Sequence, residues 1–254
     1  MERAATAIVT GGGKRVGAAI VAALLGDGWR VVAHVHHDGD SIPDGATKVV
    51  ADLGEADCAR RIFSACEKLP PVRLLVNNAA RFALDGFGDD EKAGASAAEF
   101  DAHMAVNARA PMLLIDELAR RHASGDVLVV NVTDAKLAAP NADFLSYTLS
   151  KFALAGLTEV AARALATRGI RVNAIAPALM LPSGAQGTAN FEAAHAHNPL
   201  RRAVEPGDVV AALRFLIDSR GMTGQTLTID GGQRFWSLPR DVQFLGDGQS
   251  LETK

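Results

Sequence analysis

Short apolar runs alternate with helix-compatible stretches along the chain, and this alternation limits the fold more than any other feature. Strands are predicted at residues 5–10, 29–35, 48–51, 73–77, 126–132, 171–176 and 226–229, and helices near residues 16–25, 55–68, 96–122, 144–168 and 208–219. Buried strands that alternate with helices form a parallel sheet, because a parallel crossover needs an intervening element. We therefore predict an α/β fold with helices on both faces of the sheet.

The remaining segments are predicted loops, and the whole chain, residues 1–254, is predicted to be one domain without internal repeats. Residues 179–199 contain Pro, Ser, Gly, Asn and two histidines, with a possible short helix at 191–197. Because this segment follows a strand end, we predict a lid or substrate loop, with a plain surface loop as the alternative. Residues 233–254 form a polar tail.

Composition and charge narrow the classes of partner. Apolar residues make up 48% of the 254 residues, charged residues 22%, and the net charge is −3, so no basic surface favours nucleic acid or an anionic membrane. No run of about 18 uncharged apolar residues predicts a membrane span. We expect a soluble, cytoplasmic protein with a small-molecule ligand. Cys58 and Cys66 are too few for a disulfide scaffold or a metal cluster, and we predict buried free thiols.

A glycine-rich turn lies between the first predicted strand and the first predicted helix. Its sequence, from Thr10 to Gly17, is TGGGKRVG. Glycines in this context let backbone N–H groups approach a pyrophosphate, and the helix N-terminus adds partial positive charge. The turn predicts dinucleotide binding, whereas the same glycines without the strand and helix would indicate only a tight turn.

The residues at the end of the second strand indicate which dinucleotide binds. An Asp or Glu there would accept the ribose 2′-hydroxyl of NAD and repel the 2′-phosphate of NADP. The strand instead ends at His36 and His37, and Lys14 and Arg15 add two cations in the turn. We therefore predict NADPH. Metal binding by the histidines is not expected, because they lack spaced carboxylate or cysteine partners. Asp52, after the third strand, is positioned to accept from the adenine amino group.

Tyr147 and Lys151 lie four residues apart in a helix-compatible run, so both side chains face the same side. A phenol titrates near ~10 in water and is a weak proton donor or acceptor at neutral pH unless a cation favours its ionised form. Lys151 supplies such a cation. The Tyr147–Lys151 pair alone is weak evidence for catalysis. A catalytic role for the pair needs support from the other motifs in the sequence.

These motifs together resemble the short-chain dehydrogenase/reductase family along nearly the whole chain. Order and spacing agree for Thr10 to Gly17, Asp52-Leu53, Asn77-Asn78-Ala79, Asn107, Tyr147 with Lys151, Asn173 to Pro177 and Asp230-Gly231-Gly232. The resemblance implies one Rossmann-type, doubly wound domain with a seven-stranded parallel sheet, assembled as a homotetramer or dimer.

The resemblance also implies roles for individual residues. Tyr147 would donate a proton, Lys151 would bind the nicotinamide ribose and lower the pKa of Tyr147, and Asn107 would hold a proton-relay water. Asn77 would pack beside the adenosine. The predicted cofactor site comprises Gly11, Lys14, Arg15, Val16, Gly17, His36, His37, Asp52, Leu53, Asn77, Ala79, Lys151 and Pro177, and the predicted substrate site comprises Arg15, Phe82, Asp134, Tyr147 and Leu179.

Two positions depart from the common family pattern. Arg15 replaces the usual middle glycine of the turn, and Asp134 replaces the usual catalytic serine thirteen residues before the tyrosine. Both departures resemble the pteridine reductases and dihydromonapterin reductases, in which the arginine reaches pyrophosphate and substrate and the aspartate works with the tyrosine. Phe82 matches the aromatic residue that sandwiches a pterin ring, with ordinary packing as the alternative. Ala80 stands where that subgroup often carries a hydroxyl.

The chemistry of Asp134 points the same way. Hydride delivered to a carbonyl leaves an alkoxide, which a serine and a tyrosine can stabilise and protonate. Hydride delivered to a C=N bond leaves a ring nitrogen that needs a proton, and a carboxyl group can bind it and relay that proton. Thr133 would permit a carbonyl substrate if its hydroxyl took the serine role, and Asp134 has the alternative role of a turn cap.

Three functions follow from these residues. The leading prediction is an NADPH-dependent reductase of a pterin-like heterocycle. The second is a general carbonyl or sugar reductase of the same family. The third, a non-catalytic NADP-sensing protein, is disfavoured because Tyr147, Lys151 and Asn107 are all present.

Overall fold

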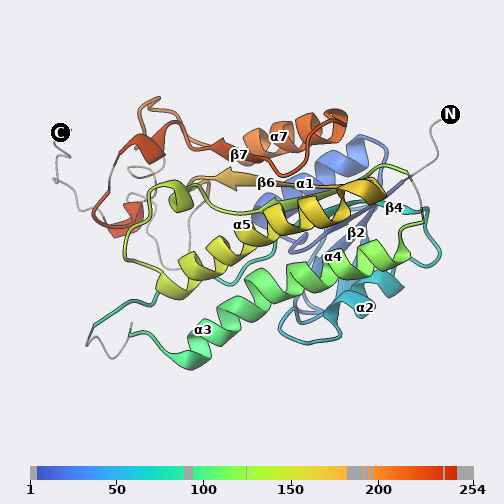
Figure 1. Cartoon of the computed structure of the whole chain (residues 1–254), viewed down its shortest axis with the longest axis horizontal. Helices are drawn as coiled ribbons and strands as arrows, with labels where there is room; N and C mark the ends of the chain where they lie inside the picture. The colour runs from blue at the N-terminus through green and yellow to red at the C-terminus, as the bar shows by residue number, and fades with distance from the viewer. Residues whose placement is uncertain are drawn as a thin grey trace.

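A seven-stranded parallel sheet forms the centre of the molecule in the computed structural model (Figure 1). The structure describes residues 5–88, 94–123, 125–181, 191, 194, 197–236 and 238–244. The strand order is β3-β2-β1-β4-β5-β6-β7, and every neighbouring pair is parallel. The strands are β1 (Thr6–Val9), β2 (Arg30–Val35), β3 (Thr47–Val50), β4 (Val72–Asn77), β5 (Val127–Val132), β6 (Ile170–Pro177) and β7 (Thr226–Ile229). The predicted Rossmann-type fold is confirmed.

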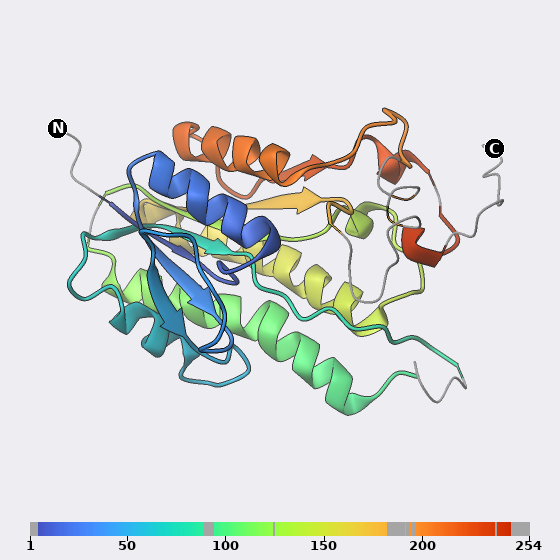
Figure 2. The ribbon, with the colours of Figure 1, turned by 180° about the vertical axis from the view of Figure 1, so that it is seen from behind.

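Helices cover both faces of the sheet and enclose two hydrophobic cores (Figures 1 and 2). The α-helices are α1 (Arg15–Gly26), α2 (Cys58–Ser64), α3 (Ala97–Met104), α4 (Ala110–Arg121), α5 (Leu145–Leu165) and α7 (Pro206–Asp218). One core packs α2, α4 and α5 against one face of the sheet, and the other packs α1 and α7 against the opposite face. Because both faces are covered, the central strands are apolar throughout rather than alternating.

Short helical turns complete the described structure. They are η1 (Ala105–Arg109), η2 (Ala135–Ala138), η3 (Ala166–Arg168), η4 (Gln233–Phe235) and η5 (Val242–Phe244). Both cysteines are buried free thiols, as predicted. Burial raises the pKa of the Cys66 thiol to about 11, so it is protonated at neutral pH. Among the described helices, none is long and apolar enough to cross a membrane.

Two predicted helices differ from the structure. The helix expected over 96–122 is interrupted by η1, a π-helical turn between α3 and α4 that contains Asn107. The helix expected over 55–68 is shorter, because α2 covers only Cys58–Ser64 and the chain continues in turns. Apolar periodicity does not distinguish an α-helix from a helix with one wider turn, since both keep one face buried. The predicted helix at 191–197 lies largely outside the described residues.

The carboxyl ends of β1, β4, β5 and β6 lie at the same end of the sheet. The turn before α1 and the start of α5 lie there too. In an open parallel sheet, ligands bind at the carboxyl ends of the strands, near the point where the strand order reverses. Here the order reverses between β1 and β4.

Candidate active site

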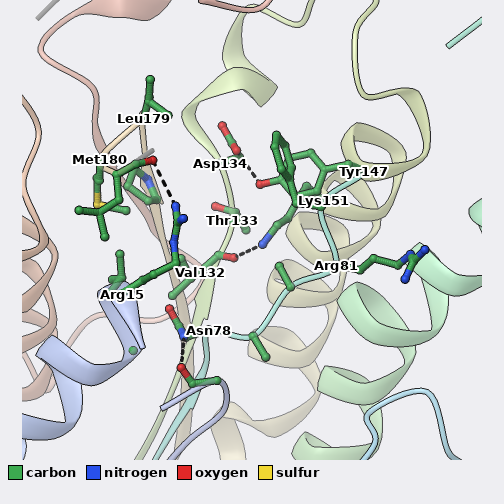
Figure 3. Close-up of a pocket in the computed structure, with 18 of the residues that line it drawn as sticks. Arg15, Asn78, Arg81, Val132, Thr133, Asp134, Tyr147, Lys151, Leu179 and Met180 are labelled. Carbon is green, nitrogen blue, oxygen red and sulfur yellow. Dashed lines mark hydrogen bonds between the residues drawn. The ribbon is translucent and has the colours of Figure 1, made fainter. Parts of the chain in front are cut away.

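A cleft of about 900 Å³ opens at this end of the sheet (Figure 3). The predicted cofactor and substrate residues that line it are Gly11, Lys14, Arg15, Val16, Gly17, His36, His37, Asp52, Leu53, Ala79, Phe82, Asp134, Tyr147, Lys151, Pro177 and Leu179. Only two of the predicted site residues, Asn77 and Asn107, do not line the cleft. Residues far apart in the sequence therefore meet in one site, as the parallel topology requires.

The glycine turn is built for close backbone approach. Gly11 has a left-handed backbone, with φ of +64°. A Cβ on Gly17 would lie 2.0 Å from the carbonyl oxygen of Gly11, so no side chain fits there without moving the backbone. Helix α1 starts immediately after Lys14 without a side-chain cap. The turn therefore leaves the helix N-terminus available to an anionic group such as a pyrophosphate.

His34 holds this turn against the sheet. The Gly11 N–H donates to His34 Nδ1 at 3.2 Å, and His34 Nε2 lies 2.9 Å from the carbonyl oxygen of Ala51. These contacts require the neutral tautomer with hydrogen on Nε2, and burial lowers the pKa of His34 accordingly. His34 is thus a sheet residue whose two ring nitrogens both have partners within the protein.

Lys14, His36 and His37 lie together at the rim beyond the turn. His36 Nδ1 lies 4.0 Å from Asp52 Oδ1, and the same Asp52 oxygen accepts the Gly54 N–H at 2.7 Å. Asp40 also lines this rim, accepting the His37 N–H at 3.0 Å, and the charge of Lys14 contributes to lowering its pKa. The rim therefore carries one lysine, two imidazoles and two carboxylates, and neither carboxylate ends β2.

Arg15 has an unusual backbone conformation. Its φ is +54°, in the left-handed region that glycine adopts most easily. This explains physically why glycine is the common residue there. The guanidinium extends across the cleft, and Nη2 donates to the carbonyl oxygen of Leu181 at 3.2 Å (Figure 3). Arg15 thereby connects the phosphate turn to the segment after β6.

The catalytic candidates meet where β5 ends and α5 begins (Figure 3). The Tyr147 hydroxyl donates to Asp134 Oδ2 at 2.7 Å, and Lys151 Nζ donates to the carbonyl oxygen of Val132 at 2.6 Å. Lys151 Nζ also lies 5.6 Å from the centre of the Tyr147 ring. All three side chains line the cleft. The helical spacing of Tyr147 and Lys151 therefore directs both side chains to the same site.

Burial shifts the proton affinities of all three groups. It raises the pKa of Asp134, and together with the Asp134 charge it raises the pKa of Tyr147 well above its ordinary value. Burial lowers the pKa of Lys151 to about 8. The pKa of Tyr147 is shifted upward by burial first and by the Asp134 charge second, and the proposed lowering of that pKa by Lys151 stays a prediction. Tyr147 is therefore protonated at neutral pH, and its raised pKa makes it a weaker acid than a free phenol.

Asp134 makes one contact suited to each of the two roles considered for it. Its Oδ1 accepts the Lys136 N–H at 2.8 Å and caps η2, while Oδ2 accepts the Tyr147 hydroxyl. The Thr133 hydroxyl instead donates to the carbonyl oxygen of Ile175 at 3.3 Å. Thr133 is thus turned to the neighbouring strand, and the serine position is held by Asp134.

Phe82 packs against Tyr147, the predicted proton donor. Its ring stacks on Phe144 with centroids 4.2 Å apart and meets Tyr147 edge-on at 4.7 Å. Phe82 is still 38% exposed and lines the cleft, so one side of the ring is open to a ligand. Phe144 enters α5 from a left-handed backbone, with φ of +58°. This backbone at a phenylalanine is costly and marks a constrained entry to the catalytic helix.

Asn77 and Asn107 are the two predicted site residues that do not line the cleft. Asn77 is 3% exposed and donates to Asn131 Oδ1 at 2.8 Å inside the sheet, while Asn78 lines the cleft and donates to the carbonyl oxygen of Thr10. Alternation along a strand explains the error, because neighbouring side chains point to opposite sides. Asn77 is therefore a sheet residue.

The Asn107 side chain is fully used by the protein. Its Oδ1 accepts the Arg81 N–H at 2.7 Å, and its Nδ2 donates to the carbonyl oxygen of Arg81 and to Ser150 Oγ, each at 2.9 Å. The side chain is 1% exposed and does not line the cleft. The side chain of Asn107 is therefore a structural tie, and the role of Asn107 in holding a proton-relay water stays a prediction.

Several residues of the cleft were not predicted. They include Asn78, Lys136, Met180, Leu181, Trp236 and Asp241. Asn78 could have been found from strand alternation, and Lys136 from its position two residues after Asp134. Nothing in the sequence near Asp241 indicates the cleft, because that contact depends on how the C-terminal segment folds back.

Comparison with known proteins places this arrangement in a family. A sequence profile described as enoyl-(acyl carrier protein) reductase matches residues 13–234. The chain belongs to the short-chain dehydrogenase/reductase family. It is therefore an oxidoreductase, and the alternative of a non-catalytic sensing protein is set aside.

Individual members of the short-chain dehydrogenase/reductase family match nearly the full chain. L-xylulose reductase from Homo sapiens is 36% identical over 247 residues, covering 91% of this chain and 96% of that protein. Pteridine reductase 1 from Leishmania tarentolae is 30% identical over 288 residues, covering 93% and 98%. The crystal structure of FolM alternative dihydrofolate reductase 1 from Brucella suis in complex with NADP superposes with a TM-score of 0.83 at 37% identity, covering 92% and 97%.

Proposed function

We propose that this reductase uses NADPH to reduce a C=N bond of a pterin-like heterocycle. The observation that carries the proposal is the hydrogen bond between Tyr147 and Asp134, with the carboxylate in the place of the usual serine. The similar pteridine reductase and FolM proteins carry names that agree with this class of substrate.

The cleft residues supply what reduction of a C=N bond requires. The bound nicotinamide would supply the hydride, and the remaining needs are a proton and a fixed ring position. Tyr147 is protonated and buried beside Asp134, so the pair can deliver a proton and bind the amino and ring nitrogens of the substrate. The open side of Phe82 offers an aromatic surface to a flat ring. Lys151 would hold the nicotinamide ribose.

NADPH fits the groups at the turn. The left-handed Gly11, the close approach of Gly17 to Gly11 and the uncapped start of α1 suit a pyrophosphate. Lys14, His36 and His37 at the rim suit a 2′-phosphate better than a free hydroxyl. The similar Brucella suis structure contains NADP.

Replacing Lys14 with alanine is expected to weaken NADPH more than NADH. A lost charged contact of this type costs about 1.5 to 3 kcal/mol, or roughly tenfold or more in Kd. Fluorescence titration with each cofactor measures the two losses. Lys48→Ala is the matched control, because Lys48 pairs with Asp38 outside the cleft. Equal losses for NADPH and NADH in Lys14→Ala would contradict the phosphate assignment.

Replacing Arg15 with glycine separates backbone strain from substrate binding. Relief of the left-handed conformation and the greater freedom of glycine in the unfolded chain offset each other, so the free energy of unfolding should change by less than about 1 kcal/mol. The lost guanidinium should raise KM for a pterin by about tenfold or more. Urea unfolding and steady-state kinetics measure the two effects. An unchanged KM would show that Arg15 serves only the turn.

The proposed activity is tested by following NADPH oxidation with dihydrobiopterin, dihydromonapterin and dihydrofolate. Turnover of at least one of them is expected, and failure of purified enzyme that binds NADPH to reduce any of them would refute the pterin assignment. A second candidate, a carbonyl or sugar reductase, is favoured by the similarity to L-xylulose reductase. Faster reduction of L-xylulose than of every pterin would support that candidate.

We also propose that the enzyme is a homo-oligomer, as a tetramer or a dimer. Helix α5 carries three exposed apolar side chains on one side, at Leu149, Phe152 and Val160, with 63% of Val160 exposed. Such a stripe along a helix suits contact with another copy. Light scattering measures the mass in solution, and a monomer at micromolar concentration would contradict the proposal.

A further inference from the structure

The segment from Leu238 to Phe244 forms one wall of the cleft at the end away from the phosphate turn. Leu238, Asp241, Val242 and Gln243 all line the cleft, and the Val242 side chain is buried. Figure 2 shows this segment, which ends in η5, beside the end of the sheet where α5 begins. The segment is therefore part of the space that a substrate enters.

Two ionic contacts hold the segment next to the catalytic residues. Arg240 Nε lies 2.9 Å from both carboxylate oxygens of Asp143, and the Asp241 N–H donates to Asp143 Oδ2 at 2.7 Å. Lys136 Nζ donates to the carbonyl oxygen of Asp143 at 2.6 Å and to Asp241 Oδ2 at 3.3 Å. Asp143 lies four residues before Tyr147, and Lys136 lies two residues after Asp134. Asp241 is thus held by Lys136, which is close in sequence to Asp134, and by Asp143, which is close in sequence to Tyr147.

Aromatic stacking fixes the same segment to the proposed ring-binding surface. Phe244 stacks on Phe144 at 5.8 Å between centroids, and Phe144 in turn stacks on Phe82. Arg240 lies over the Phe244 ring, 5.0 Å from its centre. A ligand ring on the open side of Phe82 would therefore sit at a defined place relative to Asp241.

Lys136 and Asp241 present opposite charges in a nearly buried setting. Their side chains are 10% and 14% exposed. The charge of Asp241 reaches the catalytic pair, because it contributes to raising the pKa of both Asp134 and Tyr147. Together the two groups offer one strong donor and one strong acceptor to a ligand. A hydroxyl matches both groups, because it can donate to Asp241 and accept from Lys136. An ammonium group would be repelled by Lys136, and a carboxylate would be repelled by Asp241.

We propose that Asp241, held by Lys136, is a specificity-determining residue that selects substrates carrying a neutral, hydroxyl-bearing side chain on the reduced ring. The inference rests on the proposed function and names the part of the substrate that the C-terminal segment reads. A substrate without such hydroxyls would further desolvate the Lys136–Asp241 pair and add no hydrogen bond to it, which disfavours binding of that substrate.

The test compares dihydromonapterin, whose side chain is a polyol, with a dihydropterin that carries a methyl group in its place. In wild-type enzyme, kcat/KM should favour dihydromonapterin, and Asp241→Asn should reduce that preference by about tenfold or more, the usual loss for a charged hydrogen bond. Asp57→Asn is the control, because it removes an exposed carboxylate that pairs with Arg60 away from the cleft. It should leave the preference unchanged.

The outcomes separate this inference from the proposed function. If wild-type enzyme reduces neither pterin, the proposed function fails, and the same preference is measured with L-xylulose against a diketone without hydroxyls. If Asp241→Asn keeps the wild-type preference, the inference is overturned while pterin reduction stands. If Asp241→Asn does not fold, Arg240→Ala replaces it. Arg240→Ala frees the segment from Asp143 and should lose the preference, so an unchanged preference in that variant also overturns the inference.

Discussion

Tyr147→Phe is expected to lower kcat for pterin reduction by about 10²–10⁴-fold, the range that a positioned general acid contributes. The phenylalanine keeps the ring that packs against Phe82 but removes the hydroxyl bonded to Asp134. The Kd for NADPH should stay within about twofold, because a general acid stabilises the transition state rather than the bound cofactor. Stopped-flow kinetics and cofactor titration measure the two quantities.

Thr148→Val is the matched control for this prediction. Thr148 is the next residue of α5, is also buried, and its hydroxyl has no hydrogen-bond partner within the described part of the chain. Removing it changes the helix and the local packing about as much as Tyr147→Phe does. The control should keep near-wild-type kcat. Comparable losses in both variants would mean that disturbance of α5, and not proton donation, explains the effect of Tyr147→Phe.

Asp134→Ser is expected to change which bond the enzyme reduces. The serine restores the usual family residue, which can hydrogen-bond a carbonyl oxygen but cannot hold a ring nitrogen and an amino group as a carboxylate does. The kcat for a pterin should fall by about 10²-fold or more, while reduction of L-xylulose or another ketone should rise or stay the same. Parallel assays on both classes measure the change. An undiminished pterin rate would remove Asp134 from the mechanism.

The pH dependence tests the same residue independently. Burial raises the pKa of Asp134, so its carboxyl keeps a proton at higher pH than an ordinary aspartate, which titrates near ~3.9. If the protonated acid serves the reaction, kcat/KM falls as pH rises through that pKa. Asp134→Asn should lack this fall. A fall that persists near pH 8 in Asp134→Asn belongs to Lys151, whose pKa is about 8 and which loses its charge above it.

The sequence was sufficient for the fold and for most of the cleft. Seven apolar runs became seven parallel strands, because a strand buried on both faces needs a continuous apolar segment that is easy to recognise. Motifs next to a strand end, such as those around Gly11, Asp134 and Tyr147, were located correctly. In a parallel sheet all these ends share one edge, so their meeting follows from topology.

The parts that the sequence did not reveal depend on contacts between distant segments. The side chain of Asn77 points into the sheet, and the direction of the pKa shift at Tyr147 depends on its burial and then on the nearby Asp134 charge. Asp241 reached the cleft only because Asp143 and Lys136 hold the chain that carries it. No short sequence pattern predicts these contacts, because tertiary packing sets the directions of the side chains that make them.

The amide of Asn107 has a consequence for the thermodynamics of ligand binding. By bonding both backbone groups of Arg81 and the hydroxyl of Ser150, it joins the loop before Phe82 to the second turn of α5. The aromatic surface and the proton donor are thus preorganised relative to each other before any ligand arrives. Ligand binding therefore loses little conformational entropy in this part of the site. More of the free energy of the ligand contacts then contributes to affinity.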